Sequence, residues 1–136
     1  MKIFVICSKK FYEKIPKIKE VLEVKGHVVT LPNGYDNPAD EDRYRNSGSF
    51  EHAKWKAGMF ARSVEIIGGQ DAVLVLNFAK NGVENYIGGA TFLEMYDAFR
   101  LGKKIFIYNP IPAGILADEI IGFAPVLIGG DLDKYF

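Results

Sequence analysis

The sequence has no surplus of either charge, because seventeen Lys and Arg residues balance seventeen Asp and Glu residues. Domains that bind nucleic-acid polymers usually carry a basic surplus that neutralises phosphates, so such a polymer is not an expected partner. The single cysteine, Cys7, cannot form an internal disulfide, which excludes a disulfide scaffold and favours a reducing compartment. No apolar run reaches the roughly 18 residues that span a bilayer, so we expect a cytoplasmic protein with no membrane partner.

Motifs for metals and common cofactors are also missing. The two histidines, His27 and His52, are far apart and lack the spacing of metal ligands. The segment Cys7–Phe11 contains no glycine, which disfavours a dinucleotide or flavodoxin-type phosphate loop. No Lys-Ser pair follows Gly88 and Gly89, which excludes a P-loop. We therefore expect no metal and no cofactor.

Short apolar runs predict buried strands. Three of them are continuous and rich in β-branched or aromatic residues, and two are weaker. They are Ile3–Cys7, Ala72–Leu76 and Ile105–Tyr108, then His27–Leu31 and Pro125–Ile128. Continuous runs are typical of a parallel sheet that is covered on both faces. The N-terminal run is short and lysines follow it at once, so we interpret it as a strand and not as a signal peptide.

Helical periodicity fills the intervals between these runs. Apolar residues recur at three- and four-residue spacing in Tyr12–Lys25, Phe50–Ile67 and Thr91–Leu101, and a short helix is expected over Ala113–Ile121. The alternation of strand and helix predicts a single domain over residues 1–136. Its fold class is α/β, a three-layer flavodoxin-like or Rossmann-like domain with a five-stranded parallel sheet and helices on both faces.

The segment Pro32–Gly48 has little apolar content and is predicted to be a long loop. Such loops in compact domains are either functional lids or solvated surface excursions, and the sequence leaves both open. If the segment closes over a ligand, its useful contacts would be Tyr35, Asp36, Arg43 and Arg45.

In an open α/β sheet, ligands bind at the carboxyl ends of the strands. This rule predicts that Ser8, Asn77, Glu94 and Asn109 lie along one edge. We expect Ser8, Asn77 and Asn109 to contact a substrate there. Gly88, Gly89 and Thr91 introduce a helix whose free N–H groups favour an anion or a sugar oxygen, so they complete the candidate substrate-binding set.

Glu94 is the candidate catalytic residue. A carboxylate at this edge could act as a nucleophile toward an electrophilic sugar carbon or as a general base. However, Thr91 and Glu94 also match a capping box, in which each side chain bonds the backbone N–H of the other. The spacing alone supports both interpretations.

Three segments together resemble the nucleoside 2-deoxyribosyltransferase-like superfamily, which includes deoxynucleoside 5′-monophosphate N-glycosidases. These segments are Asp71–Asn77, Gly88–Met95 and Gly102–Ile105. The resemblance implies a flavodoxin-like fold and a nucleoside or nucleotide as the small-molecule partner. It also implies assembly as a homo-oligomer, a dimer or higher, to which the C-terminal residues 131–136 could contribute.

The resemblance further implies that Glu94 attacks the anomeric carbon of the sugar and that water or a second base completes the reaction. Ser8, Gly88, Gly89 and Thr91 would shape the sugar or phosphate pocket. Two positions depart from the family pattern, because Gly88 stands where transferases often carry Asp and Ser8-Lys9-Lys10 replaces a glycine-rich turn. A non-catalytic nucleotide-binding or sensing module on the same fold is therefore the alternative, and an interaction protein is a third.

Overall fold

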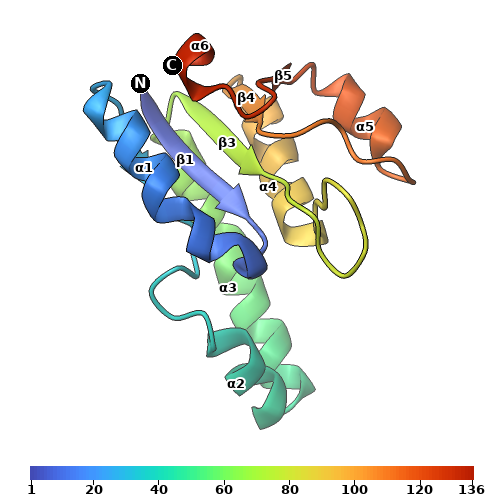
Figure 1. Ribbon diagram of the computed structural model, residues 1–136. Coiled ribbons are helices and arrows are strands. Elements are labelled where there is room, and N and C mark those ends of the chain that lie inside the picture. The colour runs from blue at the N-terminus through green and yellow to red at the C-terminus, as the bar shows by residue number, and fades with distance from the viewer.

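Five short strands form one all-parallel sheet in the computed structural model, which describes residues 1–136 (Figure 1). The strands are β1 (Lys2–Cys7), β2 (Val28–Thr30), β3 (Ala72–Leu76), β4 (Lys104–Ile107) and β5 (Val126–Leu127). Their spatial order is β2-β1-β3-β4-β5, which is the order of flavodoxin-like doubly wound sheets. The predicted fold class is confirmed.

The strand order places β3 at the centre of the sheet, with β1 beside it. Ile3 pairs with Ala72 and Cys7 pairs with Leu76, so the two strands end at the same level. Every residue of β3 is buried. Their continuous apolar sequences follow from this position, since a strand covered on both faces needs apolar side chains in both directions.

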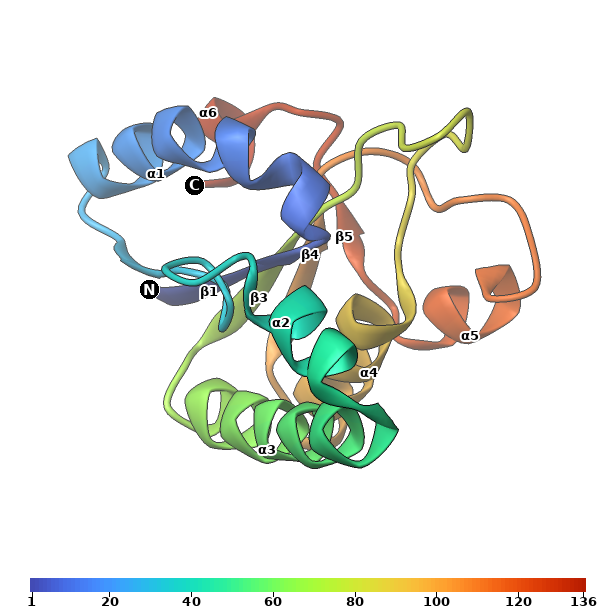
Figure 2. The same cartoon turned by 90° about the horizontal axis from the view of Figure 1, so that it is seen from below.

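Helices cover both faces of the sheet (Figure 2). They are η1 (Lys9–Lys14), α1 (Ile15–Val24), α2 (Asp40–Ser47), α3 (Ser49–Gly68), α4 (Gly89–Arg100), α5 (Ala117–Gly122) and α6 (Leu132–Tyr135). One core cluster joins Ile3 and Val5 of β1 to α1 and α6. The other joins Phe4 and Ile6 to α3, α4 and α5. None of these helices has the length and apolar character needed to cross a membrane.

The predicted Pro32–Gly48 loop is wrong in its second half, which forms α2. Its first turn contains Asp40, Glu41 and Asp42, and acidic residues stabilise a helix N-terminus. Arg43 pairs with Asp40, and further Arg–carboxylate pairs follow along the helix. The helix buries no residue, so apolar periodicity could not reveal it.

Three predicted helix starts also need correction. The short helix expected over Ala113–Ile121 begins four residues later, as α5 at Ala117. The helix expected over Tyr12–Lys25 begins earlier, as the 3-10 turn η1 capped by Ser8, and α1 then starts with Pro16 in its first turn. The helix expected to begin at Thr91 begins two residues earlier, at Gly89. This shift moves Glu94 out of the first turn of α4.

Candidate active site

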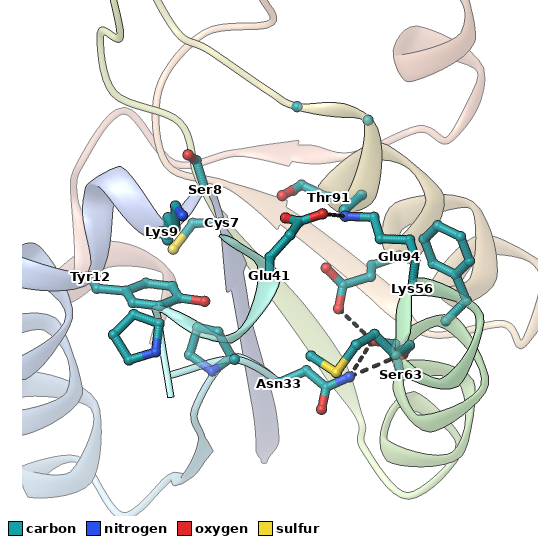
Figure 3. Close-up of a pocket in the computed structure, with 18 of the residues that line it drawn as sticks. Cys7, Ser8, Lys9, Tyr12, Asn33, Glu41, Lys56, Ser63, Thr91 and Glu94 are labelled. Atoms are coloured by element: carbon teal, nitrogen blue, oxygen red, sulfur yellow. Dashed lines mark hydrogen bonds and ion pairs between the residues drawn. The ribbon is translucent and has the colours of Figure 1, made fainter. Parts of the chain in front are cut away.

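A cavity of about 310 Å³ lies where the carboxyl ends of β1 and β2 face the beginning of α4 (Figure 3). Residues after β1, after β2, on α3 and on α4 all contribute to its lining. The helices that follow β1 and β3 cover opposite faces of the sheet (Figure 2). The cavity therefore lies at the point where the strand order reverses, which is where ligands bind in doubly wound sheets.

The start of α4 forms one wall of this cavity. Gly88 is the N-cap residue, and Gly89 and Thr91 lie in the first turn. No side chain caps this helix end, so its first N–H groups remain free to bind an anion or an oxygen of a ligand. Glu94 follows in the second turn, and its carboxylate points into the cavity (Figure 3).

The capping-box interpretation of Thr91 and Glu94 is wrong. Because α4 begins at Gly89, Thr91 is not its N-cap residue, and it is buried in the helix. The Glu94 carboxylate instead contacts another helix, since its Oε2 accepts a hydrogen bond of 3.0 Å from Ser63 Oγ on α3. The carboxyl group is thus directed away from its own backbone and toward the cavity.

The surroundings of Glu94 give it an unusual acidity. Burial is the main cause that raises its pKa to about 7, and the nearby negative charge of Asp97 acts in the same direction. The hydrogen bond from Ser63 and the positive charge of Lys56 oppose this rise. A carboxyl group with a pKa near 7 exchanges its proton in the neutral range, as acid–base and nucleophilic groups in enzymes do.

A carboxylate on α2 forms the rim of the cavity opposite Glu94. Glu41 accepts hydrogen bonds of 2.9 Å from His52 Nε2 and from Lys56 Nζ, both on α3. Burial alone would raise the pKa of Glu41, but the hydrogen bonds from His52 and Lys56 hold it below its ordinary value. These contacts fasten α2 to α3 and keep the Lys56 ammonium group at the cavity.

The wall at the end of β1 carries two weakly acidic groups, Cys7 and Tyr12. Burial, together with the charge of Glu94, raises the pKa of the Cys7 thiol to about 12. Burial and the charges of Cys7 and Glu94 raise the pKa of the Tyr12 phenol as well. Both groups therefore keep their protons at neutral pH, so Cys7 is not a nucleophile here. The Tyr12 hydroxyl can donate to a ligand.

A tight turn after β3 brings a lysine to the site. Lys80 and Val83 exchange backbone hydrogen bonds around Asn81 and Gly82, whose φ angles of 50° and 78° are those of a two-residue hairpin turn. Lys80 Nζ donates to Ser8 Oγ at 3.2 Å and lies 4.6 Å from the centre of the Tyr86 ring. No carboxylate pairs with Lys80 in this structure, so its charge remains available to a ligand.

The Tyr86 ring also explains the glycine at position 88. A Cβ atom on Gly88 would lie 3.2 Å from the Tyr86 hydroxyl oxygen and 3.3 Å from a ring carbon. Both distances are shorter than ordinary van der Waals contacts. A side chain at position 88 would therefore require the phenol of Tyr86 to move by a few tenths of an ångström.

The structure brings most of the predicted site residues together. Those that line the cavity are Ser8, Gly88, Gly89, Thr91 and Glu94. Asn77 and Asn109 lie behind it and bind each other. Asn77 Oδ1 accepts from the Asn109 backbone N–H at 2.8 Å, and Asn109 Nδ2 donates to the Asn77 carbonyl oxygen at 3.0 Å. Their position supports a role in holding the loops after β3 and β4 and gives no support to substrate contact.

Several cavity residues were not named individually from the sequence, although Asn33 and Glu41 belong to the Pro32–Gly48 segment that was considered as a ligand-covering loop. They come from the loop after β2, from α2 and from α3, and they include Asn33, Glu41, Trp55, Lys56 and Ser63. None of Tyr35, Asp36, Arg43 and Arg45 reaches the cavity. Tyr35 packs on Tyr12, and both arginines pair with acidic residues of α2. No group of three or more His, Cys, Asp or Glu residues could hold a metal ion.

No family model and no curated protein matches the sequence. Comparison of the fold with solved structures finds a clear similarity to the CMP N-glycosidase BcmB of Clostridium botulinum, with a TM-score of 0.54 and 14% sequence identity. The match covers 99% of this chain and 95% of that one. The resemblance stated from the sequence is thus confirmed at the level of the fold.

Proposed function

We propose that the chain cleaves or transfers the N-glycosidic bond of a nucleoside or nucleotide, with Glu94 as the nucleophile, as in the nucleoside 2-deoxyribosyltransferase-like superfamily. The observation that carries the proposal is the Glu94 carboxylate. It faces a cavity at the carboxyl edge of the sheet, with a pKa near neutrality (Figure 3). The shared fold with a CMP N-glycosidase supports the same reaction class.

The chemistry would proceed through two displacements. An oxygen of the ionised Glu94 carboxylate forms a bond to the anomeric carbon while the bond from that carbon to the base nitrogen breaks. The bonding electrons leave with the base, which takes up a proton from the solvent, and the water or second base that attacks in the next step returns one proton to the solvent. Water or a second base then attacks the anomeric carbon, breaks the bond to Glu94 and regenerates the carboxylate. Splitting one displacement into two easier ones is the general advantage of covalent catalysis.

Free base is the product that tests this proposal. We expect the protein to release base from at least one member of a panel of nucleosides, deoxynucleosides and their 5′-monophosphates, as measured by chromatography. Turnover should rise as the pH increases through about 7, because only the ionised form of Glu94 attacks. Thermal stabilisation by a nucleotide without any release of base would instead indicate the non-catalytic binding module.

We propose that the preferred substrates carry a phosphate, because Lys80 has no acidic partner, bonds to Ser8, and lines the same cavity as the uncapped start of α4. Lys80→Ala should raise KM for a monophosphate about 10-fold, the value expected for loss of one charged hydrogen bond. KM for the matching nucleoside should change little. Lys54→Ala, at an exposed position on α3, serves as the matched control. Equal effects of Lys80→Ala on both substrates would contradict a phosphate contact.

The proposal also includes self-association as a homo-oligomer. Adjacent turns of α3 and α4 expose large apolar side chains, and the two helices contact each other. These side chains are Phe60, Val64, Leu93 and Tyr96, which are 40% to 44% exposed. Exposed large apolar side chains that gather on two neighbouring helices are typical of an interface. Light scattering should give a mass of at least twice 15.2 kDa, and a monomeric mass would contradict this part of the proposal.

A further inference from the structure

A chain of two hydrogen bonds leads from Asn33 through Ser63 to the Glu94 carboxylate. Asn33 Nδ2 donates to Ser63 Oγ at 3.1 Å, and Ser63 Oγ donates to Glu94 Oε2 at 3.0 Å (Figure 3). The three side chains come from the loop after β2, from α3 and from α4. Ser63 is 6% exposed, so water does not compete strongly for its hydroxyl group.

The direction of these hydrogen bonds is fixed by the backbone. Asn33 Nδ2 also donates to the Met59 carbonyl oxygen at 3.0 Å. A carbonyl group only accepts, so turning the amide around would place two oxygens against each other. Asn33 Oδ1 is buried without a partner, while the amide nitrogen makes both of its hydrogen bonds, to Met59 and to Ser63. Because Ser63 Oγ accepts from Asn33, its hydrogen is left for Glu94.

Ser63 does not behave as an ordinary serine within a helix. Such a serine often donates to the carbonyl group four residues earlier, which here is that of Met59. The Met59 carbonyl group accepts from Asn33 instead, and the Ser63 hydroxyl crosses to α4. The network is therefore arranged around the carboxylate and not around the backbone of α3.

We infer that Ser63, oriented by Asn33, is a positioning residue that holds one oxygen of Glu94 and leaves the other directed at the cavity. This inference rests on the proposed function, in which Glu94 is the nucleophile. A hydrogen bond donated to a carboxylate favours its ionised form. Ser63 therefore both orients the attacking group and keeps more of it ionised at neutral pH.

Other charged and titratable groups act on Glu94 from each neighbouring element. Asp97 lies one turn further along α4 and Lys56 lies on α3, where it pairs with Glu41 of α2. Cys7 at the end of β1 and Tyr12 of η1 also lie close enough to interact with Glu94. Cys7 and Tyr12 stay protonated at neutral pH, so Asp97 and Lys56 are the charges that the test must take into account.

The first test is the pH profile of kcat/KM for base release. Ser63→Ala should move the acidic limb upward by about one pH unit, as expected for loss of a hydrogen bond to a charged group. The corresponding loss at pH 6 is about 10-fold, with a smaller loss at pH 9 and little change in KM. Ser63→Thr keeps the hydroxyl and should restore the profile. Asn33→Ala should shift the limb in the same direction by less.

Two controls test whether the acidic limb of the pH profile reflects the ionisation of Glu94. Asp97→Asn removes a negative charge next to Glu94 and should move the limb to lower pH. Ser47→Ala changes an exposed serine on α2 that bonds only to its own helix, so it should leave the profile unchanged. A uniform loss of activity at every pH in Ser63→Ala, with the limb in its original place, would overturn the inference.

The second test requires no substrate. Titration of the Glu94 side-chain carboxyl carbon by NMR, assigned with Glu94→Gln, should show the same upward shift in Ser63→Ala. If no nucleoside or nucleotide is turned over, the proposed function fails, and this titration still decides whether Ser63 acts on Glu94. An unchanged titration would overturn the inference even if the enzyme were active.

Discussion

Replacing Glu94 with Gln is expected to reduce base release by about 10⁴-fold, the scale on which removal of a catalytic nucleophile acts. The amide has nearly the same size and can still accept from Ser63 Oγ, so the cavity should keep its shape. It cannot form the bond to the anomeric carbon that the first displacement needs. The measurement is base release by chromatography, with circular dichroism to verify the fold.

Two comparisons make the Glu94→Gln result decisive. Glu65→Gln alters an exposed carboxylate on α3 and should retain full turnover. Thermal stabilisation by nucleotide should persist in Glu94→Gln, because the remaining walls of the cavity are intact. If Glu94→Gln turned over substrate at the rate of the unaltered protein, Glu94 would not be the nucleophile and the mechanism would have to be abandoned.

The largest effect on stability is expected at Asn77, which is completely buried at the end of β3. Its side chain accepts from the Asn109 backbone N–H and donates to the carbonyl oxygens of Asn109 and Pro110 at 3.2 and 2.9 Å. Asn77→Ala would leave these buried groups without partners. We expect it to lower the free energy of unfolding by about 3 kcal/mol.

Urea denaturation measures this change directly, and Asn46→Ala, at an exposed position on α2, provides the control. Asn77→Ala should lower the urea concentration at the unfolding midpoint, while the slope of the unfolding free energy against urea concentration stays similar. Some loss of activity should follow, because Asn77 holds together the loops after β3 and β4. Unchanged stability with a strongly raised KM would instead favour the substrate contact that the sequence predicted for Asn77.

The central sheet could be predicted from the sequence because each strand is a short, continuously apolar run. The predicted strand Ala72–Leu76 has its observed bounds, since a strand buried on both faces is marked by an unbroken run of apolar residues. The helix α2 could not be found in this way, because it buries no residue and depends on charge pairs within and between helices. To predict α2, one would need to know where α3 lies beside it, and the spacing of apolar residues does not give that position.

The residues of the site differ in how far the sequence could reveal them. Glu94 and Ser8 could be predicted because the carboxyl edge of a parallel sheet is a general place for ligands. Asn33 and Ser63 could not, because they are 30 residues apart in the sequence and only the packing of the β2 loop on α3 brings them together. The capping-box pattern misled for a related reason. The Thr-x-x-Glu spacing does not by itself show where the helix begins. In the structure Gly88, and not Thr91, is the N-cap residue of α4.

The attachment of α2 has a consequence for how this pocket could diversify. Glu94, the proposed nucleophile, lies on α4, which packs against the buried sheet. The part of the rim that α2 provides depends instead on the contacts of Glu41 with α3, because α2 buries no residue of its own. Selection could therefore remodel the rim, and with it the range of molecules admitted, at little risk to folding or to the position of Glu94. Homologues would then be expected to diverge most in residues 40–47 while keeping the chemistry unchanged.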